Sequence, residues 1–273
     1  MPGVKLVLCM KWGSLYGAHY VNRLHAGARR HVSGPLQFVC LTDDSSGIDP
    51  AVECRPLPAF NDIAARFGHS AWRKLELWRR DLGDDLLGRE ALFLDLDLVL
   101  VGPLDAFWDF KPGRYAAIEN WSKPGMDVGN TSVFRFVVGG HPEIFERYDS
   151  DPARVFEREF RIEQEYISAR LGNGRAARTA RGPAVARDPF YQGLREQVFW
   201  PKGWCVSFKE ELLPAWPMRL WRAAPLPRDA KIIVFHGKPD PADAMAGVWP
   251  EPKRWKRLYK RLRPAPWIAE HWR

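Results

Sequence analysis

The sequence predicts an α/β protein whose central sheet is mostly parallel. Over the first hundred residues, short apolar runs of strand length alternate with segments of helical periodicity, which is typical of strand–helix–strand units. Polar turns follow three of the strands, at Lys11, Asp43 and Asp95. Because such sheets bind ligands at the carboxyl ends of their strands, we expect these turns to border the functional site. The 273 residues suffice for one large α/β domain or two small ones.

The expected elements follow from the pattern of apolar residues. Tyr20, Leu24 and Ala28 fall on one face at helical spacing, whereas the strands are uninterrupted apolar runs bounded by turn residues. The expected strands are 4–10, 36–41, 53–57, 91–95, 115–119, 131–136 and 232–235, and the expected helices are 16–30, 71–80, 142–148 and 155–171. Residues 172–188 are rich in Gly, Ala and Arg, which predicts a mobile surface loop that acts as a lid, or a plain insertion.

The apolar run 91–100 carries two carboxylates, Asp95 and Asp97. In an extended chain, residues two apart point to the same face, so these side chains would lie side by side. Two anions in apolar surroundings repel each other and resist desolvation. A hard divalent cation, coordinated by both carboxylates and by substrate phosphates, would relieve both effects. The alternative is an exposed strand end with solvated carboxylates, but the apolar flanks favour the metal–phosphate site.

Charge and cysteine usage limit the classes of partner and compartment. The net charge is +8 and the pI is about 9.4, which favours phosphates, anionic lipid or nucleic acid without choosing among them. The spacing of the four cysteines provides no metal-binding pair; they are Cys9, Cys40, Cys54 and Cys205. We expect reduced thiols in a cytoplasmic protein, without a signal peptide or a membrane-spanning segment.

The C-terminal tail is strongly basic. Residues 253–263 contain seven basic residues and no acid, and Trp255, Leu258, Tyr259 and Leu262 recur at helical spacing. A basic amphipathic helix with aromatic side chains suits the surface of an anionic membrane. The alternative is a helix docked on the domain with a solvated basic face. We therefore divide the chain into a domain at 1–252 and a basic aromatic tail at 253–273.

Several segments, in this order, resemble the GT-A-fold glycosyltransferases, near the family-8-like sugar transferases of bacteria. The segments are 4–13, 38–44, 72–75, 92–97, 129–133, 163–167 and 235–239. The fourth looks like the family's Asp-x-Asp, the fifth resembles Asn-Ser-Ser/Gly-Val, and the last resembles the C-terminal His-Gly-x-Lys-Pro. The resemblance spans most of the chain and implies a single GT-A-like domain, followed here by the basic helix.

The resemblance implies a nucleotide-sugar donor, usually a UDP-sugar, held through Mn²⁺ or Mg²⁺. Carried over, Asp95, Asp97 and His236 would bind the metal, and this ligand set suits Mn²⁺. The diphosphate would contact Lys238 and either Arg73 or Lys74. The choice is open because Lys74 occupies the position at which the family usually has an arginine, and Arg73 directly precedes it. The further donor-binding residues implied are Lys11, Trp12, Thr42, Asp43, Asp44, Leu96, Ser132 and Gly237.

The resemblance also assigns a catalytic group of Asn130, Glu163 and Gln164, beside the anomeric carbon of the donor. Glu163 stands where the family usually has Asp, and the turn at Lys11 and Trp12 departs from the acidic or Asn residues of many members. The implied reaction transfers a hexose, with retention of its configuration, to a hydroxyl of a cell-envelope glycan or lipid-linked acceptor. Peripheral contact with the inner face of an anionic membrane would go through 253–273, and no nucleic acid is expected.

Two other functions fit parts of the sequence. A phosphatase of the haloacid-dehalogenase type would use Asp95 as nucleophile and Asp97 as general acid and base, but that motif normally opens its domain, and no later acidic motif completes its Mg²⁺ site. A non-enzymatic module that binds membrane or nucleic acid would explain the charge but not the two carboxylates. Deleting residues 253–273 should abolish only the function of such a module.

Overall fold

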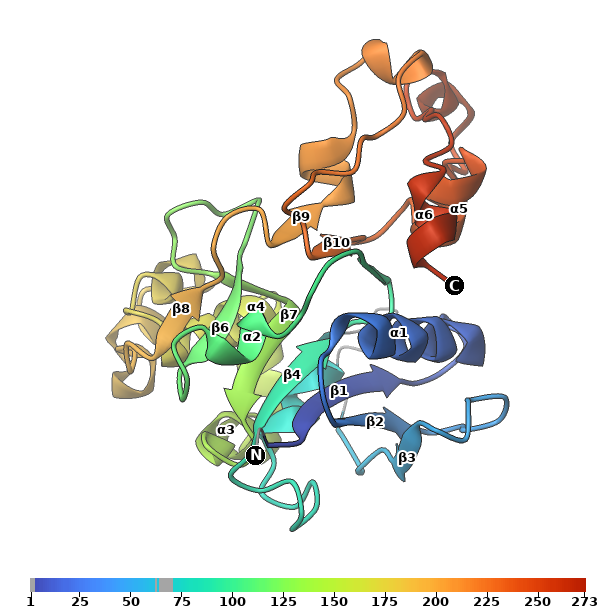
Figure 1. Cartoon of the computed structure of the whole chain (residues 1–273). Helices are drawn as coiled ribbons and strands as arrows, with labels where there is room; N and C mark the ends of the chain where they lie inside the picture. Colours follow the sequence, from blue (N-terminus) through green and yellow to red (C-terminus); the bar gives the residue numbers. More distant parts are fainter. Residues whose placement is uncertain (1–2, 62, 64–70) are drawn as a thin grey trace.

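The computed structural model describes residues 3–61, 63 and 71–273, and a seven-stranded sheet crosses its centre (Figure 1). The strand order is β3-β2-β1-β4-β7-β6-β8. Only β7 runs against its neighbours, which confirms the mostly parallel sheet. The strands are β1 (Lys5–Lys11), β2 (Leu36–Thr42), β3 (Glu53–Pro56), β4 (Glu90–Leu94), β6 (Tyr115–Glu119), β7 (Gly129–Val137) and β8 (Gln197–Phe199).

Both faces of this sheet are buried. Along β1, Val7 and Cys9 belong to one apolar cluster, whereas Leu6 and Leu8 belong to another on the opposite face. Alternate side chains of a strand point to opposite faces, so the uninterrupted apolar run at this strand reflects burial on both sides. The α-helices are α1 (Ala18–His31), α2 (Ala106–Asp109), α3 (Pro142–Ser150), α4 (Glu163–Leu171), α5 (Pro241–Ala246) and α6 (Trp267–His271).

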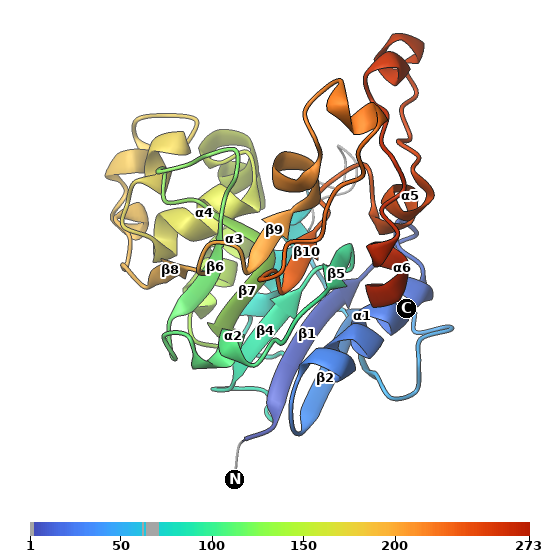
Figure 2. The same cartoon turned by 45° about the horizontal axis from the view of Figure 1, so that its top comes forward.

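A second, three-stranded sheet joins distant parts of the chain (Figure 2). It contains β5 (Leu98–Leu100), β10 (Ile232–Val234) and β9 (Cys205–Ser207), in the order β5-β10-β9. At its edge, the backbone N–H of Phe235 donates to the carbonyl oxygen of Asp97 at 3.2 Å. The Asp-x-Asp turn between β4 and β5 is thereby fixed beside the segment that follows β10.

The helical segments are more broken than the sequence pattern predicts. Within the expected helix 71–80, Ala71–Trp78 form a 3₁₀ helix. The expected helix 155–171 is split into a π-helical turn and α4 by an extended residue, Phe160. Its ring is fully buried against Tyr191, with 5.0 Å between the ring centroids, so core packing overrides helical continuity there. The 3₁₀ helices are η2 (Ala71–Trp78), η4 (Ala176–Thr179), η5 (Val185–Arg187), η6 (Pro189–Tyr191), η8 (Met218–Leu220) and η9 (Arg254–Leu258), and the π-helices are η3 (Arg154–Glu159) and η7 (Phe208–Leu212).

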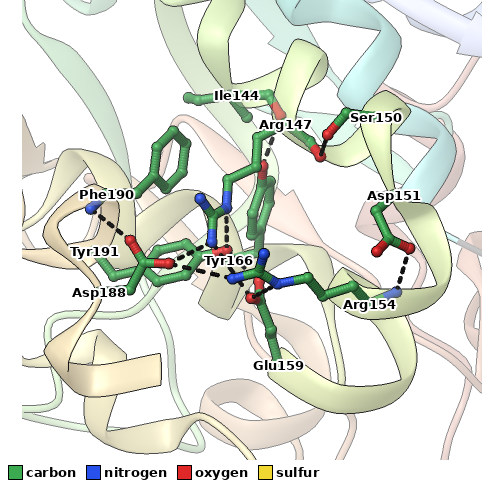
Figure 3. Close-up of polar contacts among 10 residues, drawn as sticks. All are labelled: Ile144, Arg147, Ser150, Asp151, Arg154, Glu159, Tyr166, Asp188, Phe190 and Tyr191. Carbon is green, nitrogen blue, oxygen red and sulfur yellow. Dashed lines mark hydrogen bonds and ion pairs between the residues drawn. The ribbon is translucent and has the colours of Figure 1, made fainter. Parts of the chain in front are cut away.

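Part of the segment 172–188, expected to be a mobile lid or a plain insertion, is packed onto the domain. Ala176, Ala177 and Val185 are buried in the apolar cluster that also holds α4. An ionic network next to this segment joins Asp188 to Arg147 and Arg154 (Figure 3). Ala176 and Ala177 are small enough for this close packing, whereas Ala184 and Ala186 are exposed.

The basic C-terminal segment forms a single 3₁₀ turn, η9, instead of the expected amphipathic helix. Prolines at 250 and 252 precede the turn and prolines at 264 and 266 follow it, and proline interrupts helical hydrogen bonding. Beyond it, α6 docks on the domain, and Trp272 contacts Tyr20 with 5.2 Å between ring centroids. Within the described ranges, no helix has both the length and the apolar character that a bilayer crossing requires.

Candidate active site

A cavity of about 280 Å³ opens at the carboxyl ends of β1 and β4. The segments after these strands line it, together with η2, the first half of β7, the start of α4 and the residues after β10. Because β7 runs antiparallel, its first residues reach the same edge at which the parallel strands end. The lining residues are Met10, Trp12, Leu15, Tyr16, Ala71, Lys74, Asp95, Leu96, Asp97, Asn130, Ser132, Gln164, Phe235, His236 and Gly237.

The two carboxylates of the Asp-x-Asp turn both line the cavity. Burial, with the negative charge of Asp95 as a second cause, raises the pKa of Asp97 to about 7. The phenol of Tyr16 donates a hydrogen bond to Asp97 Oδ2 at 2.9 Å, which partly opposes that rise because it stabilises the charged form. Asp97 is therefore a destabilised anion in a pocket, and perturbed carboxyl groups of this kind cluster at functional sites.

Lys74 is the cation that enters this cavity. Its Nζ donates to Asp95 Oδ2 at 2.7 Å and to the carbonyl oxygen of Thr131 at 3.0 Å. Arg73 lies on the other side of η2, where its Nε is 3.2 Å from Glu76 Oε1. Of the two basic residues that the sequence left open, Lys74 faces the cavity and Arg73 does not line it.

Polar side chains line the wall formed by β7 and α4. Asn130 Oδ1 accepts from the backbone N–H of Ser132 at 2.9 Å, and Gln164 Oε1 accepts from Asn120 Nδ2 at 2.8 Å. Glu163 does not line the cavity, because it is buried against β7, where Oε1 accepts from Thr131 Oγ1 at 2.7 Å. Of the three residues expected to be catalytic, Asn130 and Gln164 face the cavity.

His236 lines the cavity from the opposite wall. Its ring stacks on Trp121 at 5.3 Å between centroids, and Nε2 lies 2.7 Å from Ser207 Oγ. Burial, reinforced by the positive charge of Lys209, lowers the pKa of His236, so the imidazole is neutral at pH 7. A neutral imidazole can bind a metal ion, but this one already has a hydrogen-bonding partner.

Of the remaining predicted residues, Trp12, Leu96 and Gly237 line the cavity, whereas Lys11, Thr42, Asp43, Asp44 and Lys238 do not. Lys11 Nζ donates to the carbonyl oxygen of Asp44 at 3.0 Å, and Asp43 Oδ2 accepts from the backbone N–H of Gly13 at 2.8 Å. These contacts connect the turns after β1 and β2, next to Trp12. Thr42 Oγ1 caps the same turn. Lys238 is half-exposed and paired with Asp240 at 2.5 Å.

The sequence did not point to Tyr16, Phe235 or Trp121. Tyr16 was expected inside a helix, but α1 begins two residues later, and the preceding turn brings its hydroxyl to Asp97. Trp121 contacts His236 although the two residues are more than a hundred positions apart in the sequence. A local pattern carries no signal for such contacts.

A divalent cation fits this site only in part. The paired carboxylates and the raised pKa of Asp97 match the hard oxygen ligands that Mg²⁺ and Mn²⁺ prefer. However, the described residues contain no group of three or more His, Cys, Asp or Glu side chains arranged to hold a metal ion. His236 therefore does not complete a preformed triad with the two aspartates.

No protein-family model matches the chain, and no curated protein sequence matches it significantly. Solved structures, however, resemble its fold. The glycosyltransferase GlyE of Streptococcus pneumoniae TIGR4 superposes with a TM-score of 0.51 at 15% identity, over 87% of this chain and 56% of that one. The galactosyltransferase LgtC, in complex with donor and acceptor sugar analogues, gives 0.47 at 12% identity, over 86% and 88%. The bifunctional WbbM gives 0.48 at 14%, over 88% and 47%.

The likeness to GlyE establishes the fold. The chain has the α/β fold of GT-A-type glycosyltransferases, as its sequence motifs predict, and it spans about half the length of the GlyE structure. Its cavity lies at the carboxyl edge of the parallel strands, where ligands bind in open α/β sheets.

Proposed function

We propose that this chain is a metal-dependent glycosyltransferase that moves a hexose from a nucleotide sugar, with UDP as the first nucleotide to test, to a hydroxyl of a glycan or lipid-linked acceptor. One observation carries the proposal: two carboxylates, a buried lysine and two amides face one cavity in a GT-A-type fold. The free cysteines are compatible with a reducing compartment, which supports a reaction on the cytoplasmic side.

In this proposal, Asp95 and Asp97 hold a divalent cation, Mn²⁺ or Mg²⁺. When bound, the cation stabilises the negative charge on the departing nucleoside diphosphate. Lys74, released from Asp95, supplies a point charge to the same diphosphate. His236 orients the turn of Gly237 beside the donor, and Lys238 joins the diphosphate site only if it leaves Asp240.

The walls of the cavity position the sugar. Asn130 and Ser132 hydrogen-bond the donor hexose, and Gln164 lies beside its anomeric carbon, held by Asn120. The bond from that carbon to the diphosphate breaks, the acceptor oxygen bonds to the carbon, and the hydroxyl proton leaves with the diphosphate. We assign Glu163 a positioning role through Thr131 and the β7 wall. Thr42, Asp43, Asp44, Lys11 and Trp12 border the expected nucleotide side.

The test is calorimetric titration of UDP with and without Mn²⁺, on the wild-type protein and on Asp97→Ala. We expect binding that requires both the metal and Asp97. Asp84→Ala, an exposed carboxylate away from the cavity, is the matched control and should bind as the wild type does. Equal UDP affinity with and without metal would refute the metal role, and hydrolysis of p-nitrophenyl phosphate without any UDP binding would favour the phosphatase.

We also propose that residues 253–273 contact an anionic membrane peripherally, which would bring the site to a lipid-linked acceptor. The exposed Trp255 and Leu258 of η9 and the basic residues around them support this contact.

A further inference from the structure

Large apolar side chains are exposed together at one end of the molecule. In the C-terminal lobe, Trp221 is 68% exposed, Leu258 is 67% exposed and Trp255 is 63% exposed, and Trp216 and Met218 are also exposed. They come from two segments, 216–222 around η8 and 253–263 around η9. Both views place these two turns at the tip of the lobe, away from the central sheet (Figures 1 and 2).

The two segments form one surface because direct contacts hold them together. Arg263 Nε donates to the carbonyl oxygen of Leu220 at 2.7 Å. The half-buried ring of Trp249 receives a cation from each segment: the Arg219 guanidinium lies 5.8 Å from the ring centroid and Lys260 Nζ lies 5.5 Å away. We call residues 216–222 and 253–263 the aromatic–basic surface.

The charge of this surface has a single sign. Neither segment contains an acidic residue, whereas 216–222 contains two arginines and 253–263 contains seven basic residues. The neighbouring Glu251 is paired with Lys260, so it offsets little of the remaining positive charge. Water would solvate the cations of this surface, but the exposure of clustered tryptophan and leucine side chains to water is unfavourable.

We infer that the aromatic–basic surface is a docking face for an anionic lipid bilayer, with both segments in contact. Tryptophan suits the headgroup level because its ring is apolar and its N–H is polar, and each Lys or Arg near an anionic leaflet adds attraction. The inference deepens the membrane contact that is part of the proposed function, by adding 216–222, which the tail alone does not include. Nucleic acid would satisfy the charges, but not the exposed Leu258 and Met218.

The test is co-sedimentation with vesicles of phosphatidylcholine alone, or of phosphatidylcholine mixed with phosphatidylglycerol. We expect binding only to the mixed vesicles, weakened by salt. Arg222→Glu should weaken it at least about fivefold, because one attractive charge is lost and a repulsive one is added. Trp221→Ala should weaken it about tenfold through lost apolar burial. Arg158→Glu and Leu194→Ala, exposed on other parts of the molecule, are the matched controls.

The vesicle assay does not use the transfer reaction, so its outcome is independent of whether UDP binds. Wild-type protein that ignores mixed vesicles would overturn the inference. Unchanged binding of Arg222→Glu and Trp221→Ala, together with loss in Trp255→Ala, would restrict docking to the tail. Displacement by single-stranded RNA, with the tryptophan variants binding RNA normally, would assign the surface to nucleic acid instead. Thermal midpoints equal to the wild-type value would show that the variants are folded.

Discussion

At the scale of single residues, the main feature of the site is Asp97, whose charged form is disfavoured by burial. Asp97 is buried next to Asp95, and the hydroxyl of Tyr16 donates a hydrogen bond to its side chain. The raised pKa means that the native protein binds a proton more tightly at this position than the unfolded chain does. Stability therefore falls as the pH rises from the ordinary Asp value of 3.8 to about 7.

Asp97→Asn should stabilise the metal-free protein above pH 7, because the amide carries no charge to desolvate. We expect its thermal midpoint to exceed the wild-type value by about 4 °C at pH 8, and to match it near pH 4.5, where the wild-type carboxyl is protonated. Differential scanning fluorimetry in a chelator measures both. Adding Mn²⁺ and UDP should raise only the wild-type midpoint. A variant that is less stable than the wild type at pH 8 would contradict the assigned cause.

Substitutions of Lys74 and Arg73 should have different effects, the first on UDP affinity and the second on folding stability. Lys74→Ala removes the cation that faces the cavity, so UDP affinity should fall about tenfold to a hundredfold, as expected for a charged hydrogen bond. Arg73→Ala leaves the fully buried side chain of Glu76 with one cation fewer, which should cost about 3 kcal/mol of folding stability and leave UDP affinity unchanged. Titration calorimetry and urea unfolding of both variants decide this. The opposite pattern would mean that Arg73 turns to the donor.

Residue types and spacing predicted the two aspartates, because an apolar run around paired acids is a local signal. Ten of the predicted site residues line one cavity. The contacts of Tyr16 and Trp121 could not be predicted, since they depend on where separate elements meet. Glu163 is two residues from Glu165 in a short acidic segment, and both are buried; its sequence gives no sign that it points toward β7.

At the scale of elements, an ionic network beside α4 joins α3, η3 and the chain around η6. Glu159 accepts from Arg154 Nε at 2.8 Å, lies 3.3 Å from Arg147 Nη2, and accepts from the hydroxyl of Tyr191 (Figure 3). Arg147 also reaches Asp188 at 2.5 Å. Because the ring of Tyr191 lies 6.0 Å from the ring of Tyr166 on α4, this network indirectly supports Gln164 at the cavity.

Arg147→Met should loosen the segment 172–191 against α3. Removing one partner from a largely buried ionic network costs about 3 kcal/mol, because Glu159 and Asp188 lose a shared cation. Urea unfolding should show the loss, and limited proteolysis should cut within 172–191 sooner than in the wild type. Arg158→Met, which alters an exposed arginine on the neighbouring η3, should change neither. Equal protease resistance of Arg147→Met and wild type would show that alanine packing alone holds the segment.

The sequence predicted seven strands of the described part of the chain, but not β5, β8 or β9. Strands buried on both faces are continuous apolar runs, and the expected boundaries lie within about two residues of the observed ones. The π-helical turn and the extended Phe160 depend on a cluster of aromatic rings from three separate segments, which no periodicity records. Composition does not distinguish the buried Ala176 and Ala177 from the exposed Ala184 and Ala186, because alanine fits a buried turn as well as a surface loop.

At the scale of the whole molecule, the C-terminal segment is part of the core rather than an appendage. Leu262, Ala265, Ile268 and Trp272 are buried in the same apolar cluster as β1 and β10. Arg30 on α1 donates to the carbonyl oxygens of His271 and Arg273 at 2.5 and 2.9 Å. At the division expected at residue 252, the charge of the surface therefore changes, but residues on both sides of it belong to the same apolar core.

This packing changes what a truncation can test. Deleting 253–273 would remove membrane contacts and core residues together, so loss of activity would not identify a binding module. Trp272→Ala should cost about 3–5 kcal/mol, since it empties a buried site and removes the ring 4.0 Å from the Arg23 guanidinium. Trp255→Ala, which alters an exposed ring of the same type, should change stability by less than about 0.5 kcal/mol. Urea unfolding measures both substitutions. If Trp272→Ala were as stable as Trp255→Ala, α6 would be undocked in solution, and the truncation would regain its meaning as a test of the tail alone.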